Sequence, residues 1–286
     1  DELSPQVYVC EIISDTTLLT ASDDTVTLWT ISVPPIPAPV SSPPAPPARC
    51  PRRLQFEFEN LGLGTLGGGR NPHDIIYVFD ASYCPSLDVI AVGLSDGTTR
   101  VVSAATGECL AIVSIPLDKC YVTSVRFVSA REYVCTYNTG HIVVYSLSKT
   151  AKEGPDYGGV DFTLASGVVR VLGDDSTQSV VFGAAASPDG DFLVSYSADG
   201  TARLYRNAAG PEELAGKVAP PVSRMKAGVG EMYACDIKRD DEGGLVVVCG
   251  GNLEGENSFM GESVKVFKIA KELLEGGDGG EGEGGR

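Results

Sequence analysis

The sequence predicts an all-β protein built from a repeated unit of short antiparallel strands. Glycine and proline, 34 and 18 of the 286 residues, exceed their usual share, and the apolar runs are short and bounded by turn residues. A turn of Asp, Asn or Gly type followed by an alternating strand recurs five times. These five strands end on Trp29, Val102, Tyr145, Tyr205 and Phe267. The pattern favours many turns and strands over long helices.

Each of these strands completes a larger unit of strand, turn, strand, turn, strand. The middle strands are the apolar runs "TLLTA", "DVIAVG", "EYVCTY", "FLVSY" and "GLVVVCGG". The first strands are "VYVCEI", "IYVFDA", "VTSVRF", "VVFGAA" and "MYACDI". A fourth strand fits in most of the gaps between units, as "LQFEFEN", "ECLAIVSI" and "VDFTLAS". The sequence thus predicts four-stranded sheets in series.

Most of the units must contain insertions, because only the interval from Val102 to Tyr145 is as short as one uninterrupted unit. The proline-rich loop 33–52 is expected to be extended. Two further insertions are "SKTAKEGPDYGG" and "NAAGPEELAGKVAPPVSRMKAG". We expect one repeat domain over residues 1–270 and, over 271–286, a disordered Gly/Glu-rich tail with too little apolar surface to order itself.

The repeat units resemble WD40 repeats, which have four strands in about 40 to 45 residues. An Asp-Gly turn before a strand that closes on Trp or another aromatic residue carries the resemblance, which extends to about Ile269. It implies a WD40-like β-propeller with at least five recognisable four-stranded blades, and seven if complete, since most propellers of this family have seven. For this chain we expect an open or N-terminally truncated ring, with "GVVRVL", 167–172, as the best hidden strand of a further blade.

Several features of the family pattern are missing. The Trp-Asp pair that would end each third strand is absent, as at Trp29-Thr30, and Pro72-His73 is the nearest match to the Gly-His that opens a typical repeat. The hydrogen-bond network that stiffens typical blades is therefore expected to be mostly absent, with generic packing in its place. The fifth unit also lacks an outer strand, which predicts an open sheet edge between the first and fifth units.

Sequence motifs for chemistry are weak or absent. The glycines in Gly62-x-Gly64-x-x-Gly67 lead into more glycines and Pro72 instead of a helix, so a connecting loop is favoured over a dinucleotide site. No nucleophile elbow, P-loop or HExxH sequence occurs, and Asp96 and Asp199 sit in Asp-Gly turns where a structural role explains them. We predict no enzyme activity, no cofactor and no metal site.

Charge and cysteine content restrict the partners and the compartment. The formal net charge of -16 argues against nucleic acid as the primary partner, and no apolar run approaches the length of a membrane span. The eight cysteines form no C-x-x-C pair and mostly interrupt apolar runs. This pattern is typical of buried thiols in a reducing compartment, so we expect a cytoplasmic or nuclear protein.

A protein-binding rim is predicted from the alignment of the five first strands. Their shared column contains Tyr8, Tyr77, Thr123, Val181 and Tyr233. Tyrosine suits a binding surface, but packing between blades explains it as well. A second column, Glu11, Asp80 and Asp236, favours a basic peptide if it faces the rim; strand alternation equally allows the far side.

Function therefore rests on recognition. The resemblance implies a non-catalytic scaffold for protein–protein interactions, within a multiprotein complex. One alternative is a structural subunit of a large assembly, with the proline-rich loop and the acidic tail as tethers. Another is a substrate receptor of a ubiquitin ligase, although the Trp-Asp-x-Arg element of that role is absent at Trp29-Thr30-Ile31-Ser32.

Overall fold

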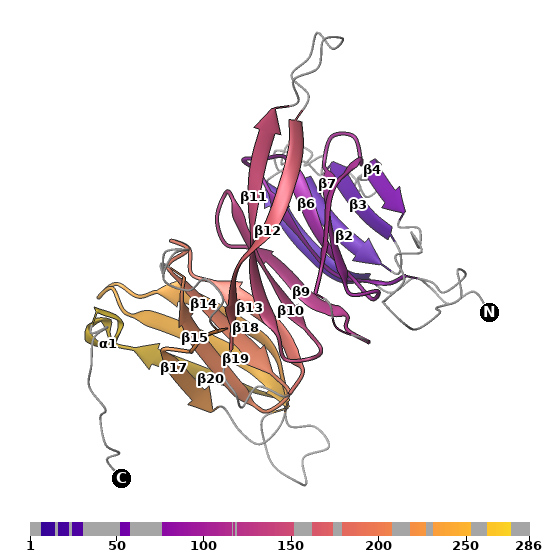
Figure 1. Ribbon diagram of the computed structural model, residues 1–286. Helices are drawn as coiled ribbons and strands as arrows, with labels where there is room; N and C mark the ends of the chain where they lie inside the picture. Colours follow the sequence, from indigo (N-terminus) through magenta and orange to yellow (C-terminus); the bar gives the residue numbers. More distant parts are fainter. Residues whose placement is uncertain are drawn as a thin grey trace, which may run out of the picture.

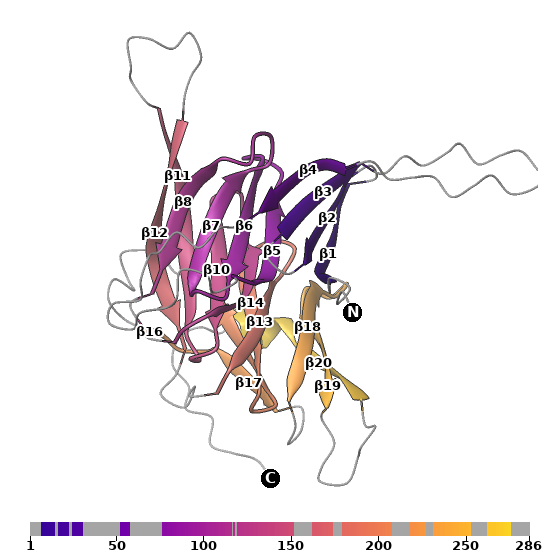
Figure 2. The same cartoon turned by 90° about the vertical axis from the view of Figure 1, so that its right-hand side faces the viewer.

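The secondary structure of the described residues is nearly all β, with the strands arranged as five small sheets (Figure 1). The computed structural model describes residues 7–14, 17–22, 25–30, 52–57, 76–115, 117, 119–151, 162–173, 179–207, 218–226, 231–252 and 262–275. We call the five sheets blades 1 to 5 in chain order. Figure 2 shows them following one another in a ring, the arrangement of a five-bladed β-propeller.

The strands of each blade follow one another in the sheet, with few exceptions. Blade 1 consists of β1 (Val7–Ser14), β2 (Thr17–Ser22), β3 (Thr25–Thr30) and β4 (Arg52–Glu57). Blade 2 consists of β5 (Val78–Cys84), β6 (Val89–Leu94), β7 (Thr98–Ser103) and β8 (Cys109–Ser114). Blade 3 consists of β9 (Val122–Phe127), β10 (Glu132–Tyr137), β11 (Ile142–Ala151), β12 (Phe162–Leu172) and the short β16 (Val218–Ala219), which pairs parallel to β12.

The last two blades complete the described fold. Blade 4 consists of β13 (Val181–Ala186), β14 (Phe192–Ser197), β15 (Thr201–Arg206) and β17 (Ser223–Lys226). Blade 5 consists of β18 (Met232–Arg239), β19 (Leu245–Asn252) and β20 (Glu262–Ile269), and the helix α1 (Lys271–Glu275) follows it. No helix among the described residues has the length and apolar character needed to cross a membrane.

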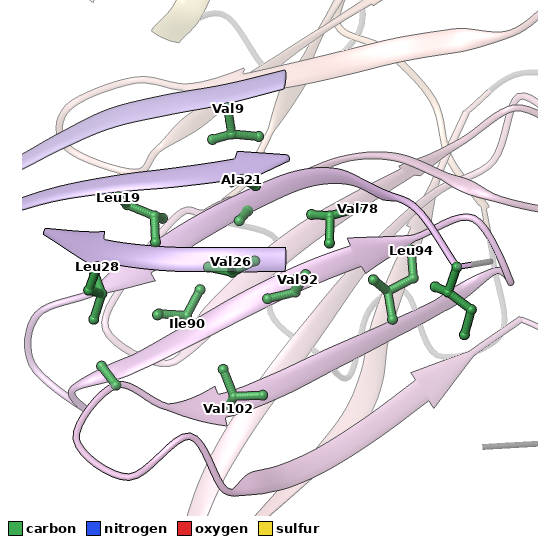
Figure 3. Packing of buried hydrophobic residues seen from close by; sticks show 13 residues of the cluster. Val9, Leu19, Ala21, Val26, Leu28, Val78, Ile90, Val92, Leu94 and Val102 are labelled. Carbon is green, nitrogen blue, oxygen red and sulfur yellow. The ribbon is translucent and has the colours of Figure 1, made fainter. Parts of the chain in front are cut away.

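The blades pack face to face, and their first strands lie innermost. β1 contacts β5, β5 contacts β9, β9 contacts β13, and β13 contacts β18. Four buried clusters fill the spaces between successive blades. Figure 3 shows the first cluster, in which Leu19 and Val26 of blade 1 lie against Ile90 and Val92 of blade 2. Burial of such side chains contributes about 1.5–3 kcal/mol each.

Packing on both faces explains the continuous apolar runs of the middle strands. Every residue of β6, the run "VIAVGL", is buried, because blade 1 covers one of its faces and blade 3 the other. A strand with a solvent face would alternate apolar and polar side chains instead. The continuous apolar runs of the middle strands therefore indicate that other blades pack against both of their faces.

Asp-Gly turns hold the third strands of blades 2 and 4. The Asp199 carboxylate accepts hydrogen bonds from the Thr201 backbone N–H (2.9 Å) and from the Ser197 hydroxyl (2.5 Å). It also forms an ion pair of 2.6 Å with Arg203, whose side chain is 4% exposed. Asp96, Thr98 and Arg100 repeat this arrangement in blade 2, with a longer ion pair of 3.4 Å. The predicted structural role of the two aspartates is confirmed.

The two turns also show that generic packing is not the whole account of blade stability. The sequence Asp-Gly-Thr-x-Arg occurs at 96–100 and at 199–203, and each copy places a buried arginine against its own turn. Gly97 and Gly200 have φ angles of 82° and 71°, which non-glycine residues rarely adopt. A local ion pair thus stiffens the turn before the third strand in two blades.

One expectation about a segment is wrong, a second is wrong for five residues, and one predicted insertion contains a strand. "GVVRVL", 167–172, is the second half of β12 and belongs to blade 3, so it is not a strand of a further blade. The insertion 207–228 contains β17, the fourth strand of blade 4. Residues 271–275 form the helix α1 instead of part of a disordered tail, with Leu274 buried against the cluster between blades 4 and 5; residues 276–286 lie outside the described residues. The glycine loop Gly62–Gly69 and most of the proline-rich loop 33–52 lie outside the described residues.

Blade 5 has a sheet face that the described residues leave uncovered. It contains three described strands, and Val248, Val264 and Val266 on this face are 37%, 68% and 59% exposed. No buried cluster joins blade 5 to blade 1 among the described residues. The sequence also predicts that this blade lacks an outer strand, and the described part of blade 5 has three strands, with no fourth outside β20.

Candidate functional site

The same β-bulge occurs near the start of every inner strand. In each case two consecutive residues of the second strand pair with two residues of the inner strand that are separated by one extra residue. In blade 4, for example, Ser197 pairs with Val181 and Tyr196 with Gly183, so that Phe182 is the extra residue. The five extra residues are Tyr8, Phe79, Thr123, Phe182 and Tyr233. Bulges of this kind change the direction of a side chain at a fixed place in a sheet.

The bulges bring aromatic side chains of neighbouring blades into contact. The ring of Phe79 in blade 2 lies 5.0 Å, centroid to centroid, from Tyr121, which directly precedes β9 of blade 3. The ring of Phe182 in blade 4 lies 5.4 Å from Tyr233 in blade 5. Phe79 and Tyr233 are 37% and 53% exposed. We call Phe79, Tyr121, Phe182 and Tyr233 the aromatic rim.

Thr123 connects the two aromatic pairs. Its hydroxyl donates a hydrogen bond of 2.5 Å to the backbone carbonyl of Val181 in blade 4 and lies 2.8 Å from the hydroxyl of Thr136 in its own blade. Contacts at the bulges thus join blade 2 to blade 3, blade 3 to blade 4 and blade 4 to blade 5. Side chains that are already held by such contacts lose less freedom when a partner binds.

An acidic group lies beside the exposed end of the rim. The Tyr233 hydroxyl donates a hydrogen bond of 2.5 Å to the Glu231 carboxylate. This bond raises the pKa of Tyr233 because it stabilises the protonated phenol beside a negative charge. Two aromatic faces next to a carboxylate favour a cationic side chain, since ring faces and carboxylates both attract positive charge.

A buried polar cluster lies farther along the inner strands. The Asp80 carboxylate accepts hydrogen bonds from the Ser124 hydroxyl (2.7 Å) and the Val125 backbone N–H (2.9 Å) of blade 3, and Arg126 lies 3.3 Å away. Burial raises the pKa of Asp80, and Arg126 opposes this shift. Burial likewise raises the pKa of Glu11, again opposed by Arg126. These contacts connect blades, so they explain Asp80 as a structural residue.

Two of the five residues in the column predicted from the sequence do not occupy a bulge. Tyr233 and Thr123 occupy bulges, and the backbone of Tyr8 does so too, although its side chain lies outside the described residues. Tyr77 lies two residues before the bulged Phe79 and is 41% exposed. Val181 is fully buried in the cluster between blades 3 and 4, so it cannot contact a partner.

The acidic column is displaced for the same reason. Glu11, Arg126 and Asp236 each lie three residues after the bulged residue of their strand, whereas Asp80 and Ser124 each lie one residue after it. Asp80 is buried and Asp236 is exposed, so the two carboxylates do not form one surface. The expectation of an acidic column is wrong, and Glu231 is the acidic residue next to the rim.

Sequence reasoning missed Phe79, Tyr121 and Phe182. A usable signal was present, because each inner strand begins with Val or Met followed by an aromatic residue or Thr. The pairs are Val7-Tyr8, Val78-Phe79, Val122-Thr123, Val181-Phe182 and Met232-Tyr233. In four of the five pairs the first residue is fully buried, so aligning on it would have placed the second in the bulge.

A cavity of about 400 Å³ is lined by residues of blades 4 and 5 and of α1, among them Phe192, Arg206 and Arg239. Arg239 is paired with Asp189 and Asp191, and the basic side chains of Arg206 and Lys271 also line the cavity. Among the described residues, no group of three or more metal-ligating side chains occurs.

The ring of five small antiparallel sheets defines a β-propeller. Residues 167–206, from the second half of β12 through β15, match the family model "WD domain, G-beta repeat". Together with the five-blade arrangement, this match supports a WD40 propeller. No curated protein matches the chain. WD40 propellers generally bind other proteins and are generally non-catalytic.

Proposed function

We propose that this protein is a non-catalytic scaffold whose aromatic rim binds a basic segment of another protein. The recurrent bulge carries the proposal, because it presents large side chains at equivalent places on successive blades. Aromatic residues at a preformed, partly exposed surface are typical of binding hot spots. The carboxylate of Glu231 beside Tyr233 supports a cationic partner residue, as does the net charge of -16.

Replacing Phe182 or Tyr233 by alanine should weaken partner binding by about 1–2 kcal/mol each, which is roughly a 5- to 30-fold loss of affinity. Co-purification from cell extract followed by mass spectrometry identifies the partner, and calorimetry with a synthetic peptide from it gives the affinity. The melting temperature should change little for Tyr233→Ala, since that side chain is 53% exposed.

A matched control is Leu273→Ala, because Leu273 is an apolar side chain of α1 that is 76% exposed. It should keep full affinity. Glu231→Gln should weaken a basic peptide and spare a charge-neutral version of the same peptide. Equal affinities of the wild type and the rim variants for every co-purified protein would contradict the proposal.

A structural subunit of a large assembly is a second candidate function, favoured by the uncovered face of blade 5. Val248, Val264 and Val266 form an apolar strip there, and isolated sheets rarely leave such a face to solvent. If an assembly covers this face, Val266→Lys should shift the endogenous complex to a smaller size in size-exclusion chromatography without lowering the melting temperature. Binding that survives Val266→Lys but not Tyr233→Ala would favour the scaffold alone.

A further inference from the structure

Two cysteines of blade 5 lie directly opposite each other. Cys235 of β18 pairs with Cys249 of β19 in the antiparallel register, and their sulfur atoms are 3.0 Å apart. Directly opposite residues of an antiparallel pair point to the same face of the sheet. The buried cysteines Cys84, Cys120 and Cys135 lie instead against hydroxyl groups, those of Ser86, Thr139 and Thr99.

The backbone positions suit a disulfide. Opposite residues of antiparallel strands have Cα atoms about 4.5–5.5 Å apart, inside the range of about 4.4–6.8 Å that disulfides span. The two sulfur atoms need to approach by about 1 Å to reach a bond length near 2.05 Å. Adjustment of the side-chain torsions is sufficient for this, so the strands keep their register.

The two thiols differ in environment. Cys249 is fully buried in the cluster between blades 4 and 5, whereas Cys235 is half-buried on the inner strand. A hydrogen bond from the Cys235 thiol lowers the pKa of Cys249, because it stabilises the thiolate. The same contact, together with burial, raises the pKa of Cys235, so Cys249 holds the thiolate of the pair and Cys235 keeps its proton.

We propose that Cys235 and Cys249 form a reversible disulfide site, oxidised by a low-molecular-weight disulfide such as glutathione disulfide. Cys235, the more accessible sulfur, passes its proton to the adjacent Cys249 thiolate as it attacks the oxidant, forms a mixed disulfide and releases one glutathione thiolate, which then takes up that proton from Cys249. The Cys249 thiolate then attacks the Cys235 sulfur and releases the second glutathione. Two protein thiols are oxidised to one disulfide, one glutathione disulfide is reduced to two glutathione molecules, and the two protons go to the released thiolates.

Oxidation would stabilise the least supported blade. Blade 5 has three described strands and an uncovered face, and the new bond would join two of its strands across one hairpin. Cross-linking restricts the unfolded chain, so the melting temperature of the oxidised protein should rise. β18 also carries Tyr233, two residues from Cys235, so the bond would fix the strand next to its bulge.

Peptide mapping of the folded wild-type protein tests the site. The protein is equilibrated with glutathione buffers of increasing disulfide fraction, the free thiols are alkylated, and trypsin is added without reductant. Trypsin cuts after Lys238 and Arg239, between the two cysteines, so the bond appears as two linked peptides. Linked peptides that form in the oxidised buffers and disappear on return to reduced glutathione are the expected result.

Cys109→Ser, which removes an exposed cysteine elsewhere, should leave the linkage intact, and Cys235→Ser should abolish it. The rise in melting temperature should be absent in Cys235→Ser as well. A stable glutathione adduct on Cys235 with Cys249 still free would overturn the proposal, because it shows that the second step fails. Linkage that forms only in denaturant, or glutathione adducts on Cys109 without any reaction at Cys235, would overturn it too.

Discussion

Replacing Asp80 by alanine should lower the free energy of unfolding by about 3–5 kcal/mol, a range typical of breaking a buried charged cluster. The variant removes the acceptor of the Ser124 hydroxyl and of the Val125 and Ala81 backbone N–H groups, and leaves Arg126 without its ion pair. Two of these donors belong to blade 3, so the contact between the inner strands β5 and β9 is weakened directly. Urea denaturation monitored by circular dichroism measures the loss.

Asp236→Ala is the matched control. Asp236 is an exposed aspartate of another inner strand, and its carboxylate accepts a hydrogen bond of 2.8 Å from the backbone N–H of its neighbour Ile237. Its effect should stay within about 0.5 kcal/mol, as for most surface substitutions. Similar losses for Asp80→Ala and Asp236→Ala would show that the interblade hydrogen bonds contribute little.

Replacing Asp199 by alanine should lower the free energy of unfolding by about 3 kcal/mol, because it removes the paired charge of the buried Arg203. The Thr201 backbone N–H and the Ser197 hydroxyl lose their acceptor in the same variant. Asp96→Ala is a graded comparison in blade 2, where the ion pair is longer, and its effect should be smaller. Equal effects of the two substitutions would mean that the turn hydrogen bonds dominate over the ion pair.

The contribution of Asp199 should also depend on pH. Burial would raise the pKa of Asp199, but hydrogen bonds from Arg203 and Ser197 outweigh burial and hold it below its ordinary value. A carboxyl group with a lowered pKa in the folded state stabilises the protein above its unfolded pKa, near 4, and this stabilisation is lost as the pH falls through the folded value. Denaturation at several pH values should therefore show the wild type and Asp199→Ala converging only in acid.

The repeat could be predicted from the sequence because it depends on local signals. The runs "DVIAVG" and "FLVSY" are apolar without alternation since neighbouring blades cover both faces, and the Asp-Gly turns fix where the next strand begins. β17 could not be predicted, because a four-residue strand within an insertion has too few residues to show a period. Its place is set by backbone pairing with β15, a contact between distant parts of the chain.

The candidate site was predicted only in part, for a different physical reason. A bulge adds a single residue to a strand, so an alignment that assumes strict alternation loses register there. Tyr77 and Val181 were aligned with Tyr233, whereas backbone pairing makes Phe79 and Phe182 its equivalents. The bulge itself appears only in the pairing with the second strand, and its trace in the sequence is the Val or Met that precedes each bulged residue. Residue type alone therefore indicated the kind of surface but found only Tyr233 among the four residues of the aromatic rim.

The sharing of buried clusters among the blades has a consequence for cooperativity. Blades 2, 3 and 4 each contribute to two of the four clusters, whereas blades 1 and 5 contribute to one each within the described residues. In such a nearest-neighbour array, the free energy of local opening depends on how many interfaces a repeat must break. Blade 3 should thus be the slowest to exchange its amide hydrogens, and fraying should begin at blades 1 and 5. The chain then behaves like a one-dimensional array whose ends are its weakest units.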